Sequence, residues 1–433
     1  MRRLIILLCT VLVLTGCSGM PSRNNITNLL SAPKFSQTES NIAEAIADHI
    51  GENITLKYSQ SQGYSSPVQL IDIDGDENDE AIVFYYAPNK GTNIRMAVLS
   101  CSGERWNIVS DKEGLGTEVF YFDTAEFKQL ENRQLLVGYL SSNIDENFFV
   151  TYFTDSEKNI PDYVERCQDI VVGDVNYDGY SDIILTNRTA DGRIRLRSLA
   201  FEDSGTYKVV GTRLLRYYNI DITQLKAAQS VKGETVLYAD YRDDYNQMHT
   251  EAVVFRDGGK MYDAFASTVV SKQWEYNTDL NCVDIDGDGY LETPSVIHTE
   301  HTDDPEILKT VEWTDYIPEQ PQRKCIGIYD THTDMFVAYP DSWQDNVTTS
   351  YGSDSWQIVR RQTEENLQQD SDQNPQQENV LVTVSQVDYR NDIETGAYSY
   401  IVYKSTKTWH FDFDRSVDLS EIQYILKNIT DLG

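Results

Sequence analysis

An acidic nine-residue segment occurs three times in this chain, each time between two apolar stretches of strand length. The copies are DIDGDENDE from Asp72, DVNYDGYSD from Asp174 and DIDGDGYLE from Asp284, and their starts lie 102 and 110 residues apart. Carboxylates held this close together repel one another. A fold that keeps three such turns therefore needs cations among them, and this requirement constrains the architecture and the chemistry together.

Oxygen-bearing side chains fall at positions 1, 3, 5 and 9 of each segment, and position 7 offers a backbone carbonyl. Ca²⁺ takes six to eight oxygen ligands in a flexible cage, whereas Mg²⁺ is a weaker candidate because it keeps its waters. Glycine at position 4 or 6 permits the sharp turn. We expect Ca²⁺ to be held by Asp72, Asp74, Asp76, Asn78 and Glu80; by Asp174, Asn176, Asp178, Tyr180 and Asp182; and by Asp284, Asp286, Asp288, Tyr290 and Glu292.

Two other calcium motifs are excluded. An EF-hand or dockerin loop needs an acid at position 12 and a helix on each side. Position 12 is Val83, Leu185 or Ser295 in the three copies, and the flanking segments have the composition of β-strands. The segments are therefore turns between strands.

Short apolar strands at even spacing, without intervening helices, indicate a mainly β repeat architecture. The five sets are PVQLIDI, EAIVFYY, IRMAVLSC and RWNIVS; FKQLENR, LLVGYL, FFVTYF and DYVERC; DIVVGDV, DIILTN, IRLRSLAF and YKVVGTRLL; ITQLKAAQ, TVLYADY, EAVVF and KMYDAF; and LNCVDI, PSVIH and KTVEW. Weaker equivalents without the acids fall near Asp123 and Asp221. The unit is thus about 50 residues with four strands, which is one β-propeller blade. Five blades are legible between about Pro67 and Tyr316, and five to seven are compatible with the pattern.

One helix precedes the repeats and a different domain follows them. Ile42, Ile46 and Ile50 share a helical face, with a capping box from Asn41 and Glu44. We expect this helix and the propeller to occupy residues 39–320 and a small α+β domain to occupy residues 321–433. That domain contains a Gln/Asn/Asp-rich loop and ends in a helix. The helix has a capping box from Asp418 and Glu421 and an apolar face formed by Ile422, Ile425, Leu426 and Ile429.

The pattern D-x-D/N-G-D-G-x-x-D/E between two apolar strands resembles the FG-GAP/VCBS repeat of integrin alpha-chain propellers and of many secreted bacterial proteins. The resemblance covers about 250 residues, and Glu77 stands where the family has glycine at position 6. It implies that the ions brace the turn between the first two strands of a blade. It also implies that the two units without acids bind no metal and that ligands bind elsewhere.

The N-terminal sequence predicts that the protein is located outside the cytoplasm. Arg2 and Arg3 precede the apolar run LIILLCTVLVL, which is too short to span a bilayer as a permanent helix. The run ends in LTGC, which resembles the bacterial lipobox and implies acylation of Cys17 on the extracytoplasmic face of a membrane. We expect a signal peptide at residues 1–16 and a flexible tether at residues 17–38. An ordinary signal peptide or a short anchor is the alternative.

Composition narrows the class of partner. The formal net charge of −33 argues against nucleic acid, because its binding requires Lys and Arg to replace the phosphate counterions. No nucleophile, zinc-protease or phosphate-loop motif is present, and His298 and His301 stand on opposite faces of an expected strand. The cysteines Cys101, Cys167, Cys282 and Cys325 lack close spacing, so a disulfide is permitted but its partners are open.

These observations favour a non-catalytic, membrane-tethered module that binds a protein or a glycan. The abundant aromatic residues, including 28 tyrosines, suit such a surface as well as the core. A cell-surface polysaccharide lyase or hydrolase is a second hypothesis, because propellers support such sites in a central pocket. A factor that assembles envelope proteins is a third.

Overall fold

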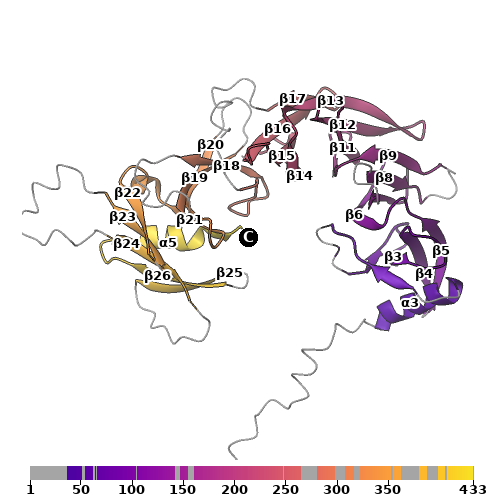
Figure 1. Ribbon diagram of the computed structural model, residues 1–433, viewed down its shortest axis with the longest axis horizontal. Coiled ribbons are helices and arrows are strands. Elements are labelled where there is room, and N and C mark those ends of the chain that lie inside the picture. Colours follow the sequence, from indigo (N-terminus) through magenta and orange to yellow (C-terminus); the bar gives the residue numbers. More distant parts are fainter. Residues whose placement is uncertain are drawn as a thin grey trace, which may run out of the picture. The chain divides into compact units, whose positions relative to one another are not determined.

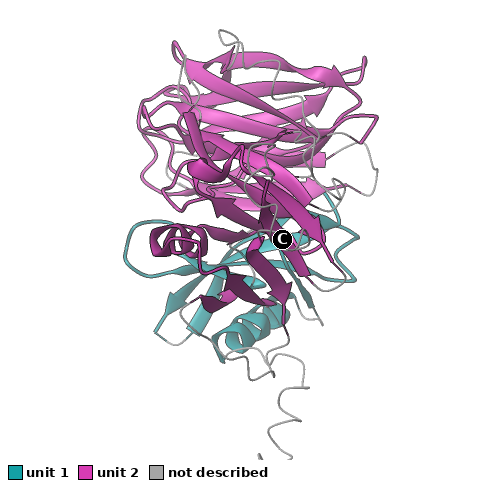
Figure 2. Ribbon diagram, turned by 90° about the vertical axis from the view of Figure 1, so that its left-hand side faces the viewer, with its two compact units in different colours: residues 1–119 teal, residues 120–433 magenta. Residues whose placement is uncertain are grey.

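The structure is a computed structural model, and the chain divides into two compact units, residues 1–119 and residues 120–433 (Figure 2). The residues that it describes are 37–50, 54–61, 64, 66–103, 105–141, 147–154, 160–246, 248–264, 280–297, 308–315, 322–352, 355–361, 380–387, 398–404 and 407–432. The predicted signal peptide, Cys17, residues 17–36 of the predicted tether, His298, His301 and most of the Gln/Asn/Asp-rich loop lie outside these residues. Within them, no helix has both the length and the apolar character needed to cross a bilayer.

The described part of the chain is mainly β, and its strands form six sheets (Figure 1). The first sheet contains β1 (Thr55–Lys57), β2 (Val68–Ile71), β3 (Glu80–Tyr86), β4 (Arg95–Ser102) and β5 (Arg105–Glu113). The second contains β6 (Glu118–Ala125), β7 (Gln134–Leu140), β8 (Asn147–Tyr152) and β9 (Tyr163–Cys167). The third contains β10 (Ile170–Gly173), β11 (Asp182–Arg188), β12 (Arg193–Glu202) and β13 (Thr206–Tyr218).

The fourth sheet contains β14 (Asp221–Gln229), β15 (Thr235–Arg242), β16 (Met248–Arg256) and β17 (Lys260–Asp263). The fifth contains β18 (Glu292–Ile297), β19 (Leu308–Asp315), β20 (Gln322–Asp330), β21 (Met335–Tyr339) and the C-terminal β27 (Ile429–Asp431). The sixth contains β22 (Val347–Tyr351), β23 (Ser355–Arg360), β24 (Val380–Gln386), β25 (Ser399–Lys404) and β26 (Lys407–Phe413). The helices are α3 (Gln37–Ile50), the short 3₁₀ helix η2 (Asp341–Trp343) and α5 (Leu419–Lys427).

The second, third and fourth sheets are four-stranded, and their strand order follows the chain. Neighbours in sequence therefore pair as antiparallel hairpins, as short strands joined by tight polar turns do. This confirms the predicted four-stranded unit and its mainly β class. The first sheet differs only in that β1 and β2 both pair with β3. Closure of the units into a propeller stays a prediction.

Apolar side chains from successive sheets share common cores within residues 120–433. Leu136 of β7 and Ile183 of β11 belong to one buried cluster, and Ile184 of β11 and Val253 of β16 belong to the next. In residues 1–119, Ile42 and Ile46 of α3 are buried with Val83 of the first sheet. Because both faces of the central strands are covered, these strands carry nearly continuous apolar runs instead of strict alternation.

The first helix begins earlier than the sequence predicts. Helix α3 starts at Gln37, so the predicted capping box of Asn41 and Glu44 is wrong. Gln37 to Ser40 are compatible with a helix, and Glu39 in the first turn suits the positive end of the helix dipole. Asn41 instead accepts a hydrogen bond from the Gln37 side chain at 2.8 Å.

The C-terminal helix agrees with its prediction in all but its last residue. Asp418 and Glu421 form the expected capping box at the start of α5. Ile422 and Ile425 are buried on its inner face. Ile429, however, lies in β27, because the helix ends at Lys427 and the chain turns into the fifth sheet.

One strand and the positions of two loops are predicted wrongly in the acid-free units. The segment FKQLENR is a turn, and Gln129 within it has a left-handed φ of 63°; the first strand of the second sheet is β6. Asp123 lies inside β6 and Asp221 begins β14, so neither marks a loop. The turns that correspond to the acidic segments are residues 126–133 and residues 230–234.

The fifth sheet contains strands from both sides of the predicted domain boundary between residues 320 and 321. Strand β20 pairs with β19, β21 pairs with β20, and β27 pairs with β21. The sixth sheet and α5 therefore lie in the chain between two strands of the fifth sheet. The hydrophobic cluster that contains Ile328 of β20 also contains Val382 of β24 and Ile425 of α5.

Candidate metal centres

The three acidic loops occupy equivalent places in three sheets. The first joins β2 to β3, and the second joins β10 to β11. The third follows an isolated bridge between Val283 and Glu292 and leads into β18. The first two loops thus connect the first two strands of their sheets, and the third lies between the bridge residue Val283 and β18.

The first carboxylate of each loop holds the turn by accepting backbone N–H groups. Asp72 accepts from Gly75 at 2.7 Å and from Glu77 at 3.1 Å. The equivalent contacts in the other loops are Tyr177, Asp178 and Gly179 to Asp174 at 2.7, 3.2 and 3.0 Å, and Gly287, Asp288 and Gly289 to Asp284 at 2.7, 3.0 and 2.8 Å. This repetition shows that the three segments share one backbone design.

The last carboxylate closes each loop in the same way. Glu80 accepts the N–H of Ile73 at 3.1 Å, and Glu292 accepts that of Ile285 at 2.8 Å. Asp182 accepts the N–H of the corresponding Val175 at 3.0 Å. Charge-assisted bonds of this kind fix a short turn firmly. The acids are therefore structural parts of the loops as well as candidate ligands.

Positions 4 and 6 of every loop have left-handed backbone conformations. Glycine accepts these angles without strain, and it occupies them except at Tyr177, with a φ of 62°, and at Glu77, with a φ of 68°. Two hydrogen bonds fix the Tyr177 side chain: its hydroxyl donates to the Phe255 carbonyl at 2.7 Å and accepts the Thr235 N–H at 2.9 Å. Glu77 is held through its backbone, whose N–H donates to Asp72 at 3.1 Å, while the residue itself is exposed to solvent.

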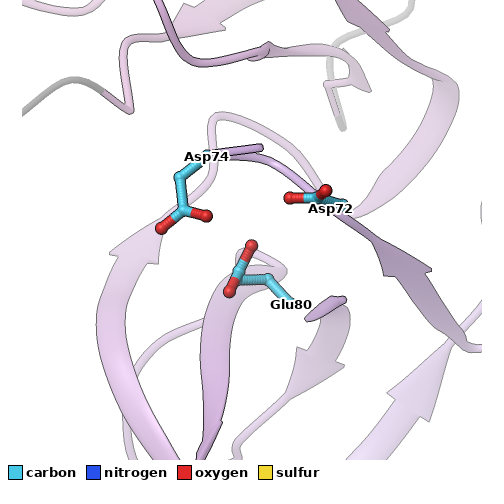
Figure 3. A group of neighbouring side chains, drawn as sticks. All are labelled: Asp72, Asp74 and Glu80. Atoms are coloured by element: carbon cyan, nitrogen blue, oxygen red, sulfur yellow. The ribbon is translucent and has the colours of Figure 1, made fainter. Parts of the chain in front are cut away.

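In the first loop, three carboxylates converge. Oxygens of Asp72, Asp74 and Glu80 lie within 4.8 Å of one another, and Figure 3 shows the three side chains pointing toward a common space. Burial raises the pKa of Glu80, and repulsion from Asp74 adds to this effect. Three acids in this arrangement supply the hard oxygen donors that Ca²⁺ and Mg²⁺ prefer.

The second loop has less negative charge for a cation to neutralise. Asn176 replaces the acid at position 3, and its amide donates to Asp182 at 3.4 Å. Burial, with repulsion from Asp178 and Asp174, raises the pKa of Asp182 to about 7. The amide partly satisfies a carboxylate that the other loops leave to an ion.

The third loop has the densest acidic surroundings. Oxygens of Asp284, Asp286 and Glu292 lie within 4.8 Å of one another. Burial and the neighbouring Asp315 carboxyl raise the pKa of Glu292 to about 9. Lys324 of β20 contacts Asp286 at 3.1 Å and also contacts Asp288.

Sequence reasoning missed Asp315 and Lys324. They are 23 and 32 residues beyond the loop's last acid, on strands that antiparallel pairing brings back beside it. Their residue types carry no motif, and only the register of β18, β19 and β20 places them there.

Two of the loops could therefore hold a metal ion. Their donor sets are carboxylate oxygens only, and among the described residues the buried Oε1 of Glu292 has no hydrogen-bond partner, which fits a hard cation. The structure brings together positions 1, 3 and 9. Side chains at position 5 accept the N–H of position 7 instead, for example Asn78 to Asp76 at 2.8 Å. Ligation by positions 5 and 7 stays a prediction.

The four cysteines of the described chain are free thiols. Cys282 is fully buried and packs with Tyr238 and Val254, as the apolar pattern around it predicts. Cys167 is also buried, whereas Cys101 and Cys325 are partly exposed. None of the four contributes to a metal group among the described residues.

A second polar cluster lies where the third and fourth sheets pack together. His249 of β16 is 6% exposed, stacks on Tyr217 at 4.5 Å between ring centroids, and contacts Asp243 at 3.0 Å. Glu251 accepts the Tyr241 hydroxyl at 2.7 Å. Arg213 reaches from β13 to Asp263 at 3.2 Å and to Glu251 at 3.9 Å. Aromatic, basic and acidic groups thus meet at one place.

The sixth sheet carries an open cavity of about 840 Å³. Its wall includes Gln357, Thr383, Ser399 and Asp412, one from each of four adjacent strands. Tyr398 and Arg415 complete a lining that offers hydrogen-bond donors, acceptors and an aromatic ring. Val380 and Phe413 add apolar surface, so the lining suits a ligand that has both polar and apolar parts.

Comparisons with known proteins add little to this geometry. No family model matches the chain, and no curated protein matches it. The chain is similar to a crystal structure of a protein from Lactobacillus plantarum, with 10% sequence identity and a TM-score of 0.26; the match covers 72% of this chain and 82% of that one. A similarity at that score does not define a shared fold.

Proposed function

We propose that the protein is a membrane-anchored extracytoplasmic lipoprotein whose calcium-stabilised β-propeller serves as a non-catalytic binding module for a protein or glycan. One observation carries the proposal. Three loops with the same carboxylate-to-backbone bonds stand at the same turn of three β-sheets. Such loops gather charge that only a bound cation neutralises fully.

Calcium is the ion that best fits the first loop. Its acids can supply several oxygens at once, and Ca²⁺ accepts more ligands and looser geometry than Mg²⁺. Binding to the folded state alone raises stability in proportion to the logarithm of ion concentration. Chelation with EDTA should therefore lower the melting temperature by several degrees, and Ca²⁺ should restore it at lower concentration than Mg²⁺.

Asp72→Ala removes one ligand of the first loop, so this variant should lose part of the calcium-dependent rise in melting temperature. Asp221→Ala is a matched control, because Asp221 is an acid at the start of β14 outside the metal groups of the described chain. Identical melting of the unmodified protein with and without Ca²⁺ would reject the cation role.

The ligand surface that we favour is the cavity on the sixth sheet. Asp412 and Arg415 offer opposite charges, and Tyr398 offers a ring for stacking on a sugar. Glycan-array binding by the calcium-loaded protein should fall in Arg415→Ala and in Asp412→Ala. A pull-down from envelope extracts tests the protein-ligand alternative, and unchanged binding in both variants places the ligand elsewhere.

Lipid anchoring rests on the sequence LTGC alone. Metabolic labelling with an alkyne fatty acid should mark the protein, and Cys17→Ser should abolish the label and release the protein from membranes. Labelling that persists in Cys17→Ser rejects this acylation site.

The cluster around His249 favours a second candidate, an enzyme that acts on cell-surface polysaccharide. Histidine and tyrosine can transfer protons, and arginine can neutralise a substrate carboxylate. Release of unsaturated or reducing ends from acidic polysaccharide, lost in His249→Ala, would support it over a purely binding role.

A further inference from the structure

The three sheets with acidic loops share an irregularity at one register of their strand ladders. In each of them, a β-bulge lies between the second and third strands after the acidic loop, and its extra residue belongs to the third strand. The bulge adjoins the residue of the second strand that pairs with the residue after loop position 9. Those register residues are Leu99, Leu199 and Thr314, and the extra residues are Val109, Val210 and Lys324. The corresponding strand pair of the fourth sheet, β16 and β17, runs without a shift.

A bulge turns the side chain of its extra residue away from the regular ladder direction. In the fifth sheet that residue is Lys324, and its ammonium group lies among the acids of the third loop. It is 3.1 Å from Asp286 and 3.6 Å from Asp315, and it contacts Asp288 as well. The other two bulges hold valine, so only this loop receives a positive charge from its own sheet at that position.

The lysine leaves some of the buried carboxyl oxygens without a partner. Glu292 has no solvent exposure and Asp315 is 8% exposed, and the two are paired across β18 and β19. Oε1 of Glu292 and Oδ1 of Asp315 have no hydrogen-bond partner among the described residues. Buried carboxylate oxygens of this kind demand a partner, and an ammonium group can supply only three donors.

We propose that Lys324 is an internal cation that competes with a divalent ion for the third loop, and that Asp315 is an additional ligand supplied by the neighbouring strand. The inference rests on the proposed calcium binding and predicts which of the two loops binds calcium more strongly. Calcium must displace the Lys324 ammonium before it can bind Asp286 and Asp288 together. The third loop therefore binds calcium more weakly than its acid count suggests, whereas no lysine or arginine of the described residues forms an ion pair with the acids of the first loop.

Such a loop exchanges one cation for another instead of standing empty. Without divalent ion, Lys324 keeps the turn neutral enough to fold. With it, the lysine side chain moves out to solvent, where it is already 23% exposed. The fifth sheet thus stays folded at low calcium and changes its surface charge at high calcium.

Two reciprocal substitutions test the competition, because they exchange the bulge residues of two sheets. Lys324→Val should raise the calcium affinity of the third loop about tenfold, the size expected when one close, half-buried ion pair is removed. Val109→Lys should lower the affinity of the first loop by a similar factor. Terbium luminescence in the whole protein measures both, with the third-loop signal defined as the part lost in Asp284→Ala and the first-loop signal as the part lost in Asp72→Ala.

The outcomes separate this inference from the proposed function. If the unmodified protein binds neither terbium nor calcium, the cation role itself fails. If it binds both but Lys324→Val leaves the third-loop affinity unchanged, the competition alone is wrong. Lys324→Gln, which keeps the polar contacts and removes the charge, should give the same increase and guards against misfolding of the valine variant, which circular dichroism checks. Asp315→Asn should weaken the third loop only, and an unchanged affinity there rejects Asp315 as a ligand.

Discussion

The turn between β14 and β15 and the turn between β10 and β11 join equivalent strands by different means. In residues 230–234, backbone atoms close the turn: Gly233 donates to the Ser230 carbonyl at 2.7 Å, and Ser230 donates to that of Glu234 at 2.8 Å. In the acidic loop, the Asp174 side chain accepts the N–H groups instead. Backbone hydrogen bonds close the first turn without a carboxylate, whereas the second turn depends on a carboxylate side chain.

This difference shows what the acids add to the fold. A carboxylate holds more N–H groups than a backbone carbonyl can, and so it supports a longer turn. The same choice concentrates negative charge, which raises the pKa of the buried member and creates the need for a cation. The acid-free turns have neither the clustered negative charge nor the raised pKa, so metal ions should not change their stability.

The largest expected effect comes from removing the central carboxylate of an acidic turn. Asp174→Ala leaves the N–H groups of Tyr177 and Gly179 without their side-chain acceptor, while that of Asp178 keeps Asn176, and should lower the free energy of unfolding by about 2 kcal/mol. Ser230→Ala removes one 3.2 Å bond from the Glu234 N–H and should cost about 0.5 kcal/mol. Urea unfolding in EDTA measures both, and equal losses would show that the two turns do not differ as described.

The next effect is a dependence on pH to which the buried acids of two acidic turns should contribute. Glu292, at about 9, and Asp182, at about 7, have pKa values raised above their ordinary values of 4.5 and 3.8. Between those limits the folded chain binds more protons than the unfolded chain, so the stability of the metal-free protein falls as pH rises. The loss from pH 7 to pH 8 alone should be about 2 kcal/mol, most of it from Glu292 and the rest from Asp182.

Calcium should reverse part of this trend, because it binds the ionised carboxylates. Melting curves at pH 6 and pH 8, with EDTA and with Ca²⁺, measure the effect. A calcium-induced rise in melting temperature that is larger at pH 6 contradicts the assignment. Glu292→Gln should flatten the metal-free profile.

The smallest effect has opposite signs in two loops. Glu77→Gly relieves a left-handed backbone at an exposed residue and should stabilise the protein by about 1 kcal/mol. Tyr177→Gly relieves the same strain but loses two hydrogen bonds to the fourth sheet, so it should destabilise by about 1 kcal/mol. Thermal unfolding of both variants, measured in EDTA, distinguishes them, and a change of the same sign in both contradicts the bridging role of Tyr177.

Much of the fold could be predicted because the signals are local. Apolar runs such as EAIVFYY mark strands through their composition, and the capping box of Asp418 and Glu421 marks a helix start within four residues. The loop acids were also recognisable from their spacing within nine residues, although the spacing alone did not show that positions 1, 3 and 9 converge while position 5 accepts an N–H group. Errors arose where local patterns were ambiguous, as in FKQLENR, whose apolar spacing fits a strand although Gln129 turns the chain.

Other features could not be predicted because they depend on register between distant residues. Lys324 is one lysine among many until a bulge between β19 and β20 places it beside Asp286. The pairing of β27 with β21 joins residues that lie about 90 positions apart, and no local pattern records it. Long-range pairing of this kind also hides the extent of the fifth sheet.

The position of β27 has a consequence for how the chain acquires its structure during synthesis. Strand β21 exposes an open edge until Ile429–Asp431 pairs with it, and the whole sixth sheet and α5 leave the ribosome between the two strands. The β21 edge of the fifth sheet therefore stays unpaired while the sixth sheet is still being synthesised. A nascent chain that stalled in this interval would present an adhesive strand edge to its neighbours, so the late strand protects the earlier one from misassembly.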